Sequence, residues 1–529
     1  MTRPSITVRF RLAAFVLAFI PFASQGASGD AAERATAKVF DSIRADPGLA
    51  IAFLRRMPKG GDLHNHISGA IYAESYVGWA AEDGLCYDAR SLALAGCDAD
   101  HPDVKGALAA DGKLYGRLVD AWSMRNREPA GQSGHEQYFD AFAKFRAAAG
   151  NRLPDMAAEV ATHSAGEGLI YLELMLTPDN RRSRDLGKHV GWQENLAVGR
   201  RNLLDYRPAE PGDPATVADV VANSRAGLDA MEKRQREIMA CGQPAAAAGC
   251  GVVTRYIFQI SRTLSPAEVY AQMIVAMELA RTDSRFVGLN LGQPEDAPAA
   301  LANFRPQMRM LDFLHRIYPE VHISLHAGEF APGLTPPEAQ RFHIAESVRT
   351  GHAERIGHGV DILYEDNPYR LLREMAERRV LVEVCLSSND DILGVRGKNH
   401  PLKTYLAYGV PTALATDNAG IARSDISREF LKAAEDIGVD YGDLKRMARA
   451  SLEYAFVEGR SLWRDGGDYQ PVAACAGKAS GWQASATPAA ACQAVLDSSV
   501  KARLQWRLEQ DLAEFERIYS RCSGKTACP

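Results

Sequence analysis

The sequence predicts an α/β protein built on a (β/α)8 barrel of the TIM type, with inserted loops and a helical, disulfide-stapled C-terminal extension. Short apolar segments rich in β-branched residues alternate with segments of helical periodicity, and strands that alternate with helices form a parallel sheet. Polar motifs follow four of these segments, at the end of such a barrel where active sites lie. With 529 residues, 46% of them hydrophobic, the chain is long enough to bury a barrel core.

Eight segments have the composition of strands. We expect them at 61–66, 169–176, 252–260, 286–291, 322–326, 355–360, 380–386 and 411–416. The barrel should therefore occupy residues 58–465. Two long connections rich in alanine, glycine and proline, about 82–135 and 208–251, are expected to be insertions that form lids or edge decorations.

Two regions flank the expected barrel. Residues 27–57 have the pattern of two short helices separated at Asp46-Pro47-Gly48. Residues 466–529 form the C-terminal extension, in which apolar residues recur at helical spacing: Leu504, Leu508, Leu512, Phe515 and Tyr519. We expect this last helix to pack on the barrel rather than to bind a membrane or a partner helix.

The first 26 residues have the features of a signal peptide. Three arginines precede an apolar run at 12–22, and small residues follow at 24–26. An uncleaved anchor helix is the alternative, although the run is shorter than the ~20 apolar residues that a membrane span needs. We therefore expect export to the periplasm or beyond the cell, with no membrane attachment after cleavage.

Cysteine usage fits an oxidising compartment, because eight of the nine cysteines fall into near pairs. Pairing by proximity gives four expected disulfides: Cys86–Cys97, Cys241–Cys250, Cys475–Cys492 and Cys522–Cys528. The ninth, Cys385, lies in an apolar run and is expected to be a buried core thiol. Other connectivities stay open, because eight cysteines permit ~105 pairings.

The charge pattern excludes several classes of partner. The net charge is −5 and the signs are mixed, with no basic run beyond the N-terminus. Neither nucleic acid nor an anionic membrane surface is therefore an indicated partner. We expect a small-molecule substrate.

Four separated fragments hold the side chains of one hydrolytic zinc site. They are His64-Asn65-His66, His326-Ala327-Gly328-Glu329, Arg355-Ile356-Gly357-His358-Gly359 and Thr416-Asp417. The side chains of residues two apart in a strand point to the same face, so His64 and His66 can bind one ion together. His326 and Asp417 would complete the shell, leaving a position for a water whose pKa zinc lowers to roughly 7.

Hydrolysis also needs a proton shuttle and a group that orients the attacking oxygen. Glu329 lies three residues past His326, and His358 lies at the end of the sixth expected strand. A carboxyl and an imidazole in these positions fit the two roles. A lone His-x-His pair is often accidental, but the conjunction of six such residues is not.

The ordered motifs resemble those of the adenosine deaminase family, within the metal-dependent amidohydrolase superfamily. The resemblance runs from about 57 to 456 and includes Met57-Pro58-Lys59, Asp62-Leu63-His64-Asn65-His66, His326 to Glu329, Glu383-Val384-Cys385, Ser387-Ser388-Asn389 and Thr416-Asp417. The N-terminal signal, near-paired cysteines and inserted loops are similar to its secreted branch, the adenosine deaminase-related growth factors. Residues 27–57 are shorter than the dimerising domain of that branch, so no oligomeric state is carried over.

The resemblance implies zinc-dependent deamination of adenosine or 2′-deoxyadenosine to inosine or 2′-deoxyinosine plus ammonia. Carried over by position, His64, His66, His326 and Asp417 would bind zinc. Glu329 would protonate the ring nitrogen next to C6, and His358 would orient the attacking oxygen. One zinc is expected, because the segment 286–291 has no lysine to bridge a second metal.

Departures from the family pattern fall on the expected substrate-binding residues. Asn418 stands where the family has a second aspartate, and Ser68 stands where many members have an acidic residue facing the sugar. Gln293 occupies the position of a glycine, although a shift of one residue would restore Gly292. Glu295 either lines the pocket or is a surface acid.

These departures leave two rival functions open. One is a zinc amidohydrolase that deaminates another aminopurine or amino-heterocycle. The other is a secreted binding protein without turnover, although binding alone does not demand all six metal and catalytic residues.

Overall fold

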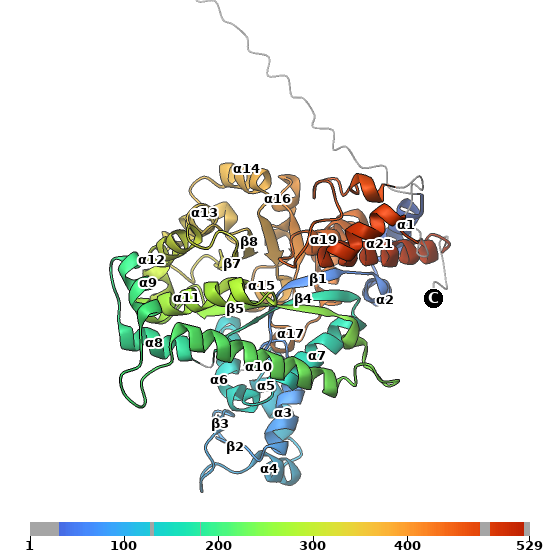
Figure 1. Ribbon diagram of the computed structural model, residues 1–529. Helices are drawn as coiled ribbons and strands as arrows, with labels where there is room; N and C mark the ends of the chain where they lie inside the picture. Colours follow the sequence, from blue (N-terminus) through green and yellow to red (C-terminus); the bar gives the residue numbers. More distant parts are fainter. Residues whose placement is uncertain (1–30, 127–131, 180, 477–486, 523–529) are drawn as a thin grey trace, which may run out of the picture.

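The computed structural model describes residues 31–126, 132–179, 181–476 and 487–522, in which eight parallel strands form a barrel surrounded by helices (Figure 1). In order around the barrel the strands are β1 (Gly60–His66), β4 (Leu169–Leu176), β5 (Val253–Ser261), β6 (Phe286–Gly292), β7 (His322–Ala327), β8 (Arg355–His358), β9 (Leu381–Val384) and β10 (Thr412–Leu414). Each coincides with a predicted segment to within two residues at either end. The predicted (β/α)8 barrel is confirmed.

The barrel closes between its first and last strands just past the end of β10. The Asp417 backbone N–H donates to the His64 carbonyl over 2.8 Å, and the His66 N–H donates to the Asp417 carbonyl over 2.9 Å. Hydrogen bonds of this parallel type fix the register of two chains relative to each other. Barrel closure therefore holds three of the predicted metal ligands together.

The helices and the two extra strands are as follows. The helices are α1 (Ala31–Ile43), α2 (Pro47–Arg56), α3 (Ala73–Glu82), α4 (Val104–Ala110), α5 (Leu114–Ala121), α6 (Gly134–Ala149), α7 (Leu153–Gly166), α8 (Arg182–Val190), α9 (Leu196–Asp205), α10 (Val217–Ile238), α11 (Pro266–Thr282), α12 (Pro298–His315), α13 (His343–Arg349), α14 (Pro368–Arg378), α15 (Leu386–Leu393), α16 (Leu402–Ala407), α17 (Ala419–Ala422), α18 (Ile426–Lys432), α19 (Tyr441–Glu453), α20 (Ala490–Ser498) and α21 (Val500–Tyr519). The strands β2 (Cys86–Tyr87) and β3 (Leu94–Ala95) pair antiparallel.

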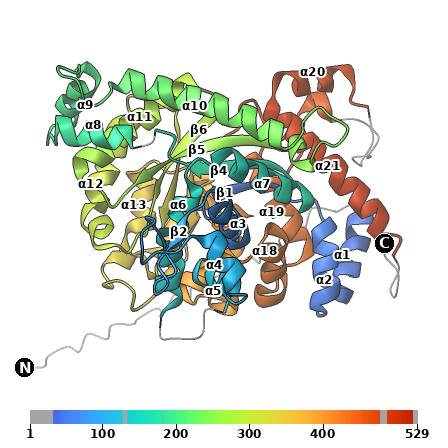
Figure 2. The ribbon, with the colours of Figure 1, turned by 90° about the horizontal axis from the view of Figure 1, so that it is seen from below.

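The region expected as the first insertion contains the β2–β3 hairpin and helices α4 and α5, which lie beside α3 (Figure 2). Leu114, Leu118 and Trp122 are buried in the main core, so this region adds to the core as well as decorating it. It leads into α6, which begins with a capping box between Ser133 and Glu136. The region expected as the second insertion contains α10, which packs against α7 and α11.

Helices from the two ends of the chain pack side by side, with α1, α19 and α21 in contact (Figure 1). Asp46 caps α2 by accepting from the backbone N–H groups of Gly48 and Leu49. The Phe53 ring then lies 4.9 Å from that of Phe515 and 4.6 Å from that of Tyr519. The apolar face of α21 is thus buried against the α1–α2 hairpin and the barrel.

Three of the four predicted disulfides are present: Cys86–Cys97, Cys241–Cys250 and Cys475–Cys492. The fourth involves Cys528, which lies outside the described residues, as does the expected signal peptide. Cys385 is a free, buried thiol, as predicted. In the part of the chain that the structure describes, no helix combines the length and apolar character needed to cross a membrane.

A buried ion-pair network fills the barrel interior below the predicted metal ligands. The Arg355 guanidinium contacts Glu173 at 2.5 Å and Glu383 at 2.7 Å, and all three side chains are at most 1% exposed. Glu173 also accepts from the Tyr171 hydroxyl and from the Phe456 N–H. Charges buried this deeply need partners, and each of these has them.

We expect Glu173→Ala to lower the free energy of unfolding by ~3–5 kcal/mol, because it leaves Arg355 buried with half of its counter-charge. Glu514→Ala is the matched control: it breaks an exposed pair with Arg517, and exposed pairs contribute little to stability. Urea denaturation followed by circular dichroism compares the two variants. Equal stability losses would contradict a structural role for the network.

Candidate active site

The predicted metal ligands and catalytic groups meet at the carboxyl ends of the barrel strands. His64 and His66 lie on β1, His326 lies on β7, His358 is the last residue of β8, and Asp417 follows β10. All five side chains are nearly or fully buried. Strand periodicity and barrel closure together aim them at one place, where such barrels have their active sites.

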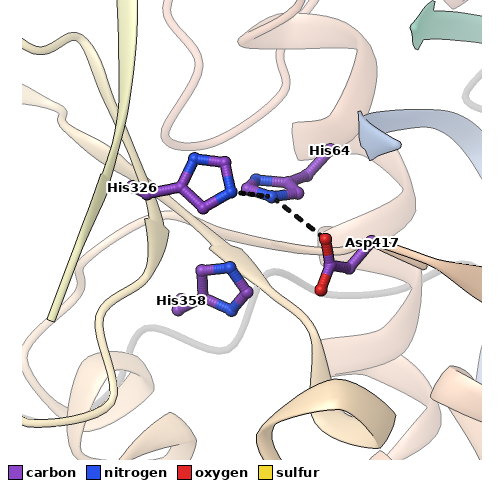
Figure 3. Close-up of side chains that lie close together, drawn as sticks. All are labelled: His64, His326, His358 and Asp417. Carbon is purple, nitrogen blue, oxygen red and sulfur yellow. Dashed lines mark hydrogen bonds and ion pairs between the residues drawn. The ribbon is translucent and has the colours of Figure 1, made fainter. Parts of the chain in front are cut away.

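The ligand atoms of four residues lie close together, at 3.1 to 3.6 Å in four of their pairs. His64 Nε2 lies 3.1 Å from His326 Nε2, and His66 Nε2 lies 3.2 Å from the same atom. Asp417 Oδ1 lies 3.2 Å from His66 Nε2 and 3.6 Å from His64 Nε2. Figure 3 shows His64 between His326 and Asp417, with His358 below them.

Second partners fix the orientation of each ligand ring. His64 Nδ1 lies 2.7 Å from a Glu383 carboxylate oxygen, and His326 Nδ1 lies 2.6 Å from Asn290 Oδ1. His66 Nδ1 lies 2.9 Å from Gln259 Oε1. These oxygens accept the Nδ1 protons, so each Nε2 lone pair points to the shared centre.

This donor set fits a zinc ion. Neighbouring ligand atoms of a tetrahedral zinc site with bonds of ~2.0–2.1 Å lie about 3.3 Å apart. The four measured separations, 3.1 to 3.6 Å, match that spacing. Three imidazoles and one carboxylate are ligands that zinc prefers.

Electrostatics at the centre favour a positive charge. Burial opposes the charged form of His64, but hydrogen bonds with Asp417 and Glu383 raise its pKa to about 10. Burial also opposes the charged form of Asp417, but its hydrogen bonds with His64 and His66 hold its pKa well below the usual value. A cation bound here would replace the proton on His64.

A second grouping is possible, because the ligand atoms of His64, His326, His358 and Asp417 all lie within 4.8 Å of one another. We favour His66 over His358 as the fourth ligand, because both of its Nε2 contacts are 3.2 Å long. His358 Nε2 has no hydrogen-bond partner and lies 3.7 Å from Glu329. That leaves it free to face an attacking oxygen.

Glu329 is a buried carboxyl beside this centre. Burial raises its pKa well above the usual range, and the negative charges of Asp417 and Glu295 add to the effect. Its backbone N–H donates to Glu295 over 2.9 Å, and the same Glu295 carboxylate lies 2.6 Å from His343 Nδ1. A carboxyl held in this environment is suited to donating a proton near neutral pH.

A cavity of about 400 Å3 opens onto Glu329, His326 and Asp417. Its other lining residues are His66, Ser68, Tyr138, Phe139, Phe142, Phe145, Arg146, Ala149, Gln259, Gln293, Pro294, Ile392 and Asn418. Its size suits a small molecule, and the aromatic wall suits a flat heterocycle. The Tyr138 hydroxyl also donates to Asp417 Oδ2 over 3.2 Å.

The wall supplied by α6 was missed by the sequence analysis. Tyr138, Phe142 and Phe145 recur at spacings of four and three residues, so an apolar helical face was visible. Nothing in the sequence alone indicated that this face turns toward the metal ligands. Gln259 was also missed, because it is a single polar residue in a strand.

The predicted substrate-binding residues divide into two groups. Ser68, Gln293 and Asn418 line the cavity. Gly292 and Glu295 are not among its lining residues: a Cβ on Gly292 would meet Gln259 at 2.6 Å, and Glu295 is 1% exposed beneath Glu329. The interpretation of Glu295 as a surface acid is therefore wrong, because its carboxylate supports the Glu329 backbone instead.

Three predicted site residues have left-handed backbones, which non-glycine residues rarely adopt. The φ angles are 77° at Gln293, 70° at His358 and 56° at Asp417. Such strain clusters at functional sites. Gln293 thus has a backbone conformation that favours glycine, whereas Gly292 does not have a positive φ.

Gln293→Gly should therefore fold without loss of stability, since relief of a strain of ~1 kcal/mol offsets the added flexibility of glycine. It also removes a side chain from the cavity wall. We expect the KM for the best purine substrate to change more than the melting temperature does. Gln243→Gly, on an exposed turn, is the control; a melting temperature that falls further for Gln293→Gly would contradict the strain argument.

Comparison with known proteins gives partial matches. The family model described as adenosine deaminase matches residues 219–461. Aminodeoxyfutalosine deaminase from Streptomyces coelicolor is 32% identical over 245 residues, 45% of this chain and 57% of that protein. Adenosine deaminase from Escherichia coli is 36% identical over 137 residues, 26% of this chain and 38% of that protein. The chain thus spans less than two thirds of the length of either relative.

Among solved structures, adenine deaminase from Arthrobacter aurescens superposes with a TM-score of 0.49 and 17% sequence identity. The superposition covers 76% of this chain and 94% of the other.

Proposed function

We propose that the chain is a member of the adenosine deaminase family, and that it is a zinc-dependent aminohydrolase that converts adenosine or 2′-deoxyadenosine to inosine or 2′-deoxyinosine and ammonia. The observation that carries the proposal is the meeting of three imidazole Nε2 atoms and one carboxylate beside the buried carboxyl of Glu329. A binding protein would not need this combination.

The residues around the cavity support each requirement of hydrolytic deamination. Zinc, held by His64, His66, His326 and Asp417, would supply a Lewis acid that activates water. Glu329 can protonate the ring nitrogen beside the reacting carbon, because burial raises the pKa of its carboxyl well above the usual value and so favours the protonated form. The aromatic side chains of α6 limit the access of bulk water, which strengthens electrostatic interactions inside.

His358 can position the attacking water. Its Nε2 is buried, lacks a hydrogen-bond partner and faces the same space as Glu329, 3.7 Å away. Positioned groups of this kind contribute by stabilising charge that develops during the reaction.

A second candidate substrate class has specific support. The positions that depart from the family pattern, Ser68, Gln293 and Asn418, all line the cavity. Asn418 donates to Asp417 Oδ1 over 2.7 Å, while its amide oxygen is buried without a partner. The cavity therefore offers a substrate different hydrogen-bond partners from those of the family pattern. This difference supports another aminopurine or amino-heterocycle as the substrate.

We also propose that the protein is exported to the periplasm or beyond the cell. The arginine-led apolar run at the N-terminus supports export, and so do the three disulfides. Fractionation of cells that express the full chain, with immunoblotting of each fraction, tests the proposal.

The function is tested by following the loss of adenosine's ultraviolet absorbance with purified protein whose zinc content is measured in the same sample. Turnover at about one zinc per chain supports both the metal site and the substrate. One zinc without adenosine turnover would contradict the substrate assignment, and a panel of aminopurines, nucleosides and pterins would then identify the amino-heterocycle. Absence of zinc would contradict the metal site.

A further inference from the structure

A chain of three buried side chains runs from the catalytic centre to α16. His358 Nδ1 lies 3.0 Å from Asn389 Oδ1, and Asn389 Nδ2 lies 2.9 Å from His400 Nε2, with the two ends of the amide interchangeable by a 180° rotation. The Leu402 backbone N–H donates to His400 Nδ1 over 3.2 Å. His358, Asn389 and His400 are all at most 4% exposed, so water does not replace these partners.

The backbone bond to His400 determines where its proton lies. A peptide N–H can only donate, so His400 Nδ1 must be an acceptor without a proton. A neutral imidazole carries one proton, which must then lie on Nε2. A doubly protonated ring would have no acceptor at all and is excluded by the same bond. His400 Nε2–H therefore donates to Asn389.

The proton on His400 in turn orients the Asn389 amide. An amide presents an acceptor at its oxygen and donors at its nitrogen, and hydrogen-bond partners decide which end faces which group. Because His400 Nε2–H donates, the end facing His400 must be the oxygen, which requires the Asn389 amide to be rotated by 180° from the placement with Oδ1 toward His358. The end facing His358 is then the NH2 group, which donates to His358 Nδ1.

We infer that His400, acting through Asn389, holds His358 in the tautomer with a bare Nδ1 and a proton on Nε2. His358 then presents an N–H donor to the reacting centre. His400 is a positioning residue, since it does not reach the cavity. The inference about the proton is independent of substrate, but its catalytic meaning rests on the proposed function.

This tautomer limits what His358 can do. With Nε2 already protonated, His358 cannot take a proton from the attacking water. It can donate a hydrogen bond to that oxygen, and so orient it and stabilise negative charge on it. The acid–base work then falls to Glu329, whose carboxyl lies 3.7 Å from the same Nε2.

The direct test is nuclear magnetic resonance of the zinc-loaded protein labelled with ¹⁵N-histidine, at about pH 8, where an unperturbed imidazole is neutral. Long-range ¹⁵N–¹H correlations within each ring distinguish the two tautomers, and spectra of His358→Gln and His400→Phe assign the signals. We expect both His358 and His400 to carry the proton on Nε2. A His358 ring that carries its proton on Nδ1, or on both nitrogens, would overturn the inference.

Asn389→Asp supplies a second test with nearly the same shape. A carboxylate only accepts, so the His358 proton should move to Nδ1 while His400 keeps its own on Nε2. We expect kcat to fall roughly 10²-fold, as when one donor to a developing oxyanion is removed, with little change in KM or bound zinc. An unchanged His358 tautomer would contradict the proposed orientation of the amide.

The matched control is Asn303→Asp, the same substitution on α12, where Asn303 donates to the Ala299 carbonyl. It should leave the tautomers and kcat unchanged.

If Asn389→Asp fails to fold, His400→Phe replaces it as the test. Loss of the His400 Nε2–H should then give His358 a mixture of tautomers. The expected tautomer in a protein inactive on adenosine would support this inference while contradicting the proposed substrate.

Discussion

Glu329→Gln should lower kcat for adenosine by roughly 10²- to 10⁴-fold, the usual contribution of a general acid or base. Glutamine keeps the size of the side chain and cannot give up a proton to a ring nitrogen at a useful rate. Zinc content should stay at one per chain, because no ligand is changed. Near-normal turnover in the zinc-loaded variant would remove Glu329 from the mechanism.

The pH dependence gives this prediction a second measurement. Burial raises the pKa of Glu329 well above its usual value, so the protonated, active carboxyl persists to a higher pH than it would in an exposed glutamate. Activity that depends on this proton should be present below the raised pKa and should fall as the pH rises through it. The wild-type profile of kcat should show this alkaline decline, and the residual activity of Glu329→Gln should lack it.

The matched control is Glu338→Gln, the same substitution on an exposed residue of the loop between β7 and α13. It should retain wild-type kcat and the alkaline decline. Loss of activity in both variants would point to a general effect on folding instead.

The barrel was predictable because several of its strands are short apolar runs buried on both faces. Leu169–Leu176, buried at every position, was predicted with its bounds unchanged. Strands β8 to β10 each end two residues earlier than predicted, and β9 and β10 also begin one residue later. There the chain turns at residues such as His358, whose positive φ ends the regular pairing. Sequence periodicity does not show such backbone conformations.

The meeting of these side chains at one site was predictable because they belong to few residue types in short, ordered motifs. Their supporting residues were not, because support depends on distance in space. His400 lies outside any expected motif, yet it is linked to His358 through one amide. The sequence does not decide whether Glu295 lines the pocket or is a surface acid, and the structure places it beneath Glu329. Both residues act through contacts in the protein interior, and spacing along the chain does not predict such contacts.

Replacing a true zinc ligand should cost far more metal affinity than replacing a neighbour. We expect His66→Ala to lose stoichiometric zinc and all measurable turnover, and His358→Ala to keep zinc while losing activity. Substitution of a residue that only supports a ligand lowers affinity by ~10–100-fold, so the loss for His66→Ala should exceed that range. Equilibrium dialysis followed by metal analysis compares the two variants, with His322→Ala, half-exposed and paired with Glu354, as the control.

The same variants give a stability measurement that does not depend on substrate. Zinc that binds the folded chain stabilises it by ~4 kcal/mol when its free concentration is 1,000 times the dissociation constant. Chelation should therefore lower the melting temperature of the wild type, of His358→Ala and of His322→Ala. It should not lower that of His66→Ala, which has no tightly bound ion to lose. Loss of zinc from His358→Ala with retention by His66→Ala would instead assign the fourth ligand to His358, in line with the wider grouping of side chains within 4.8 Å.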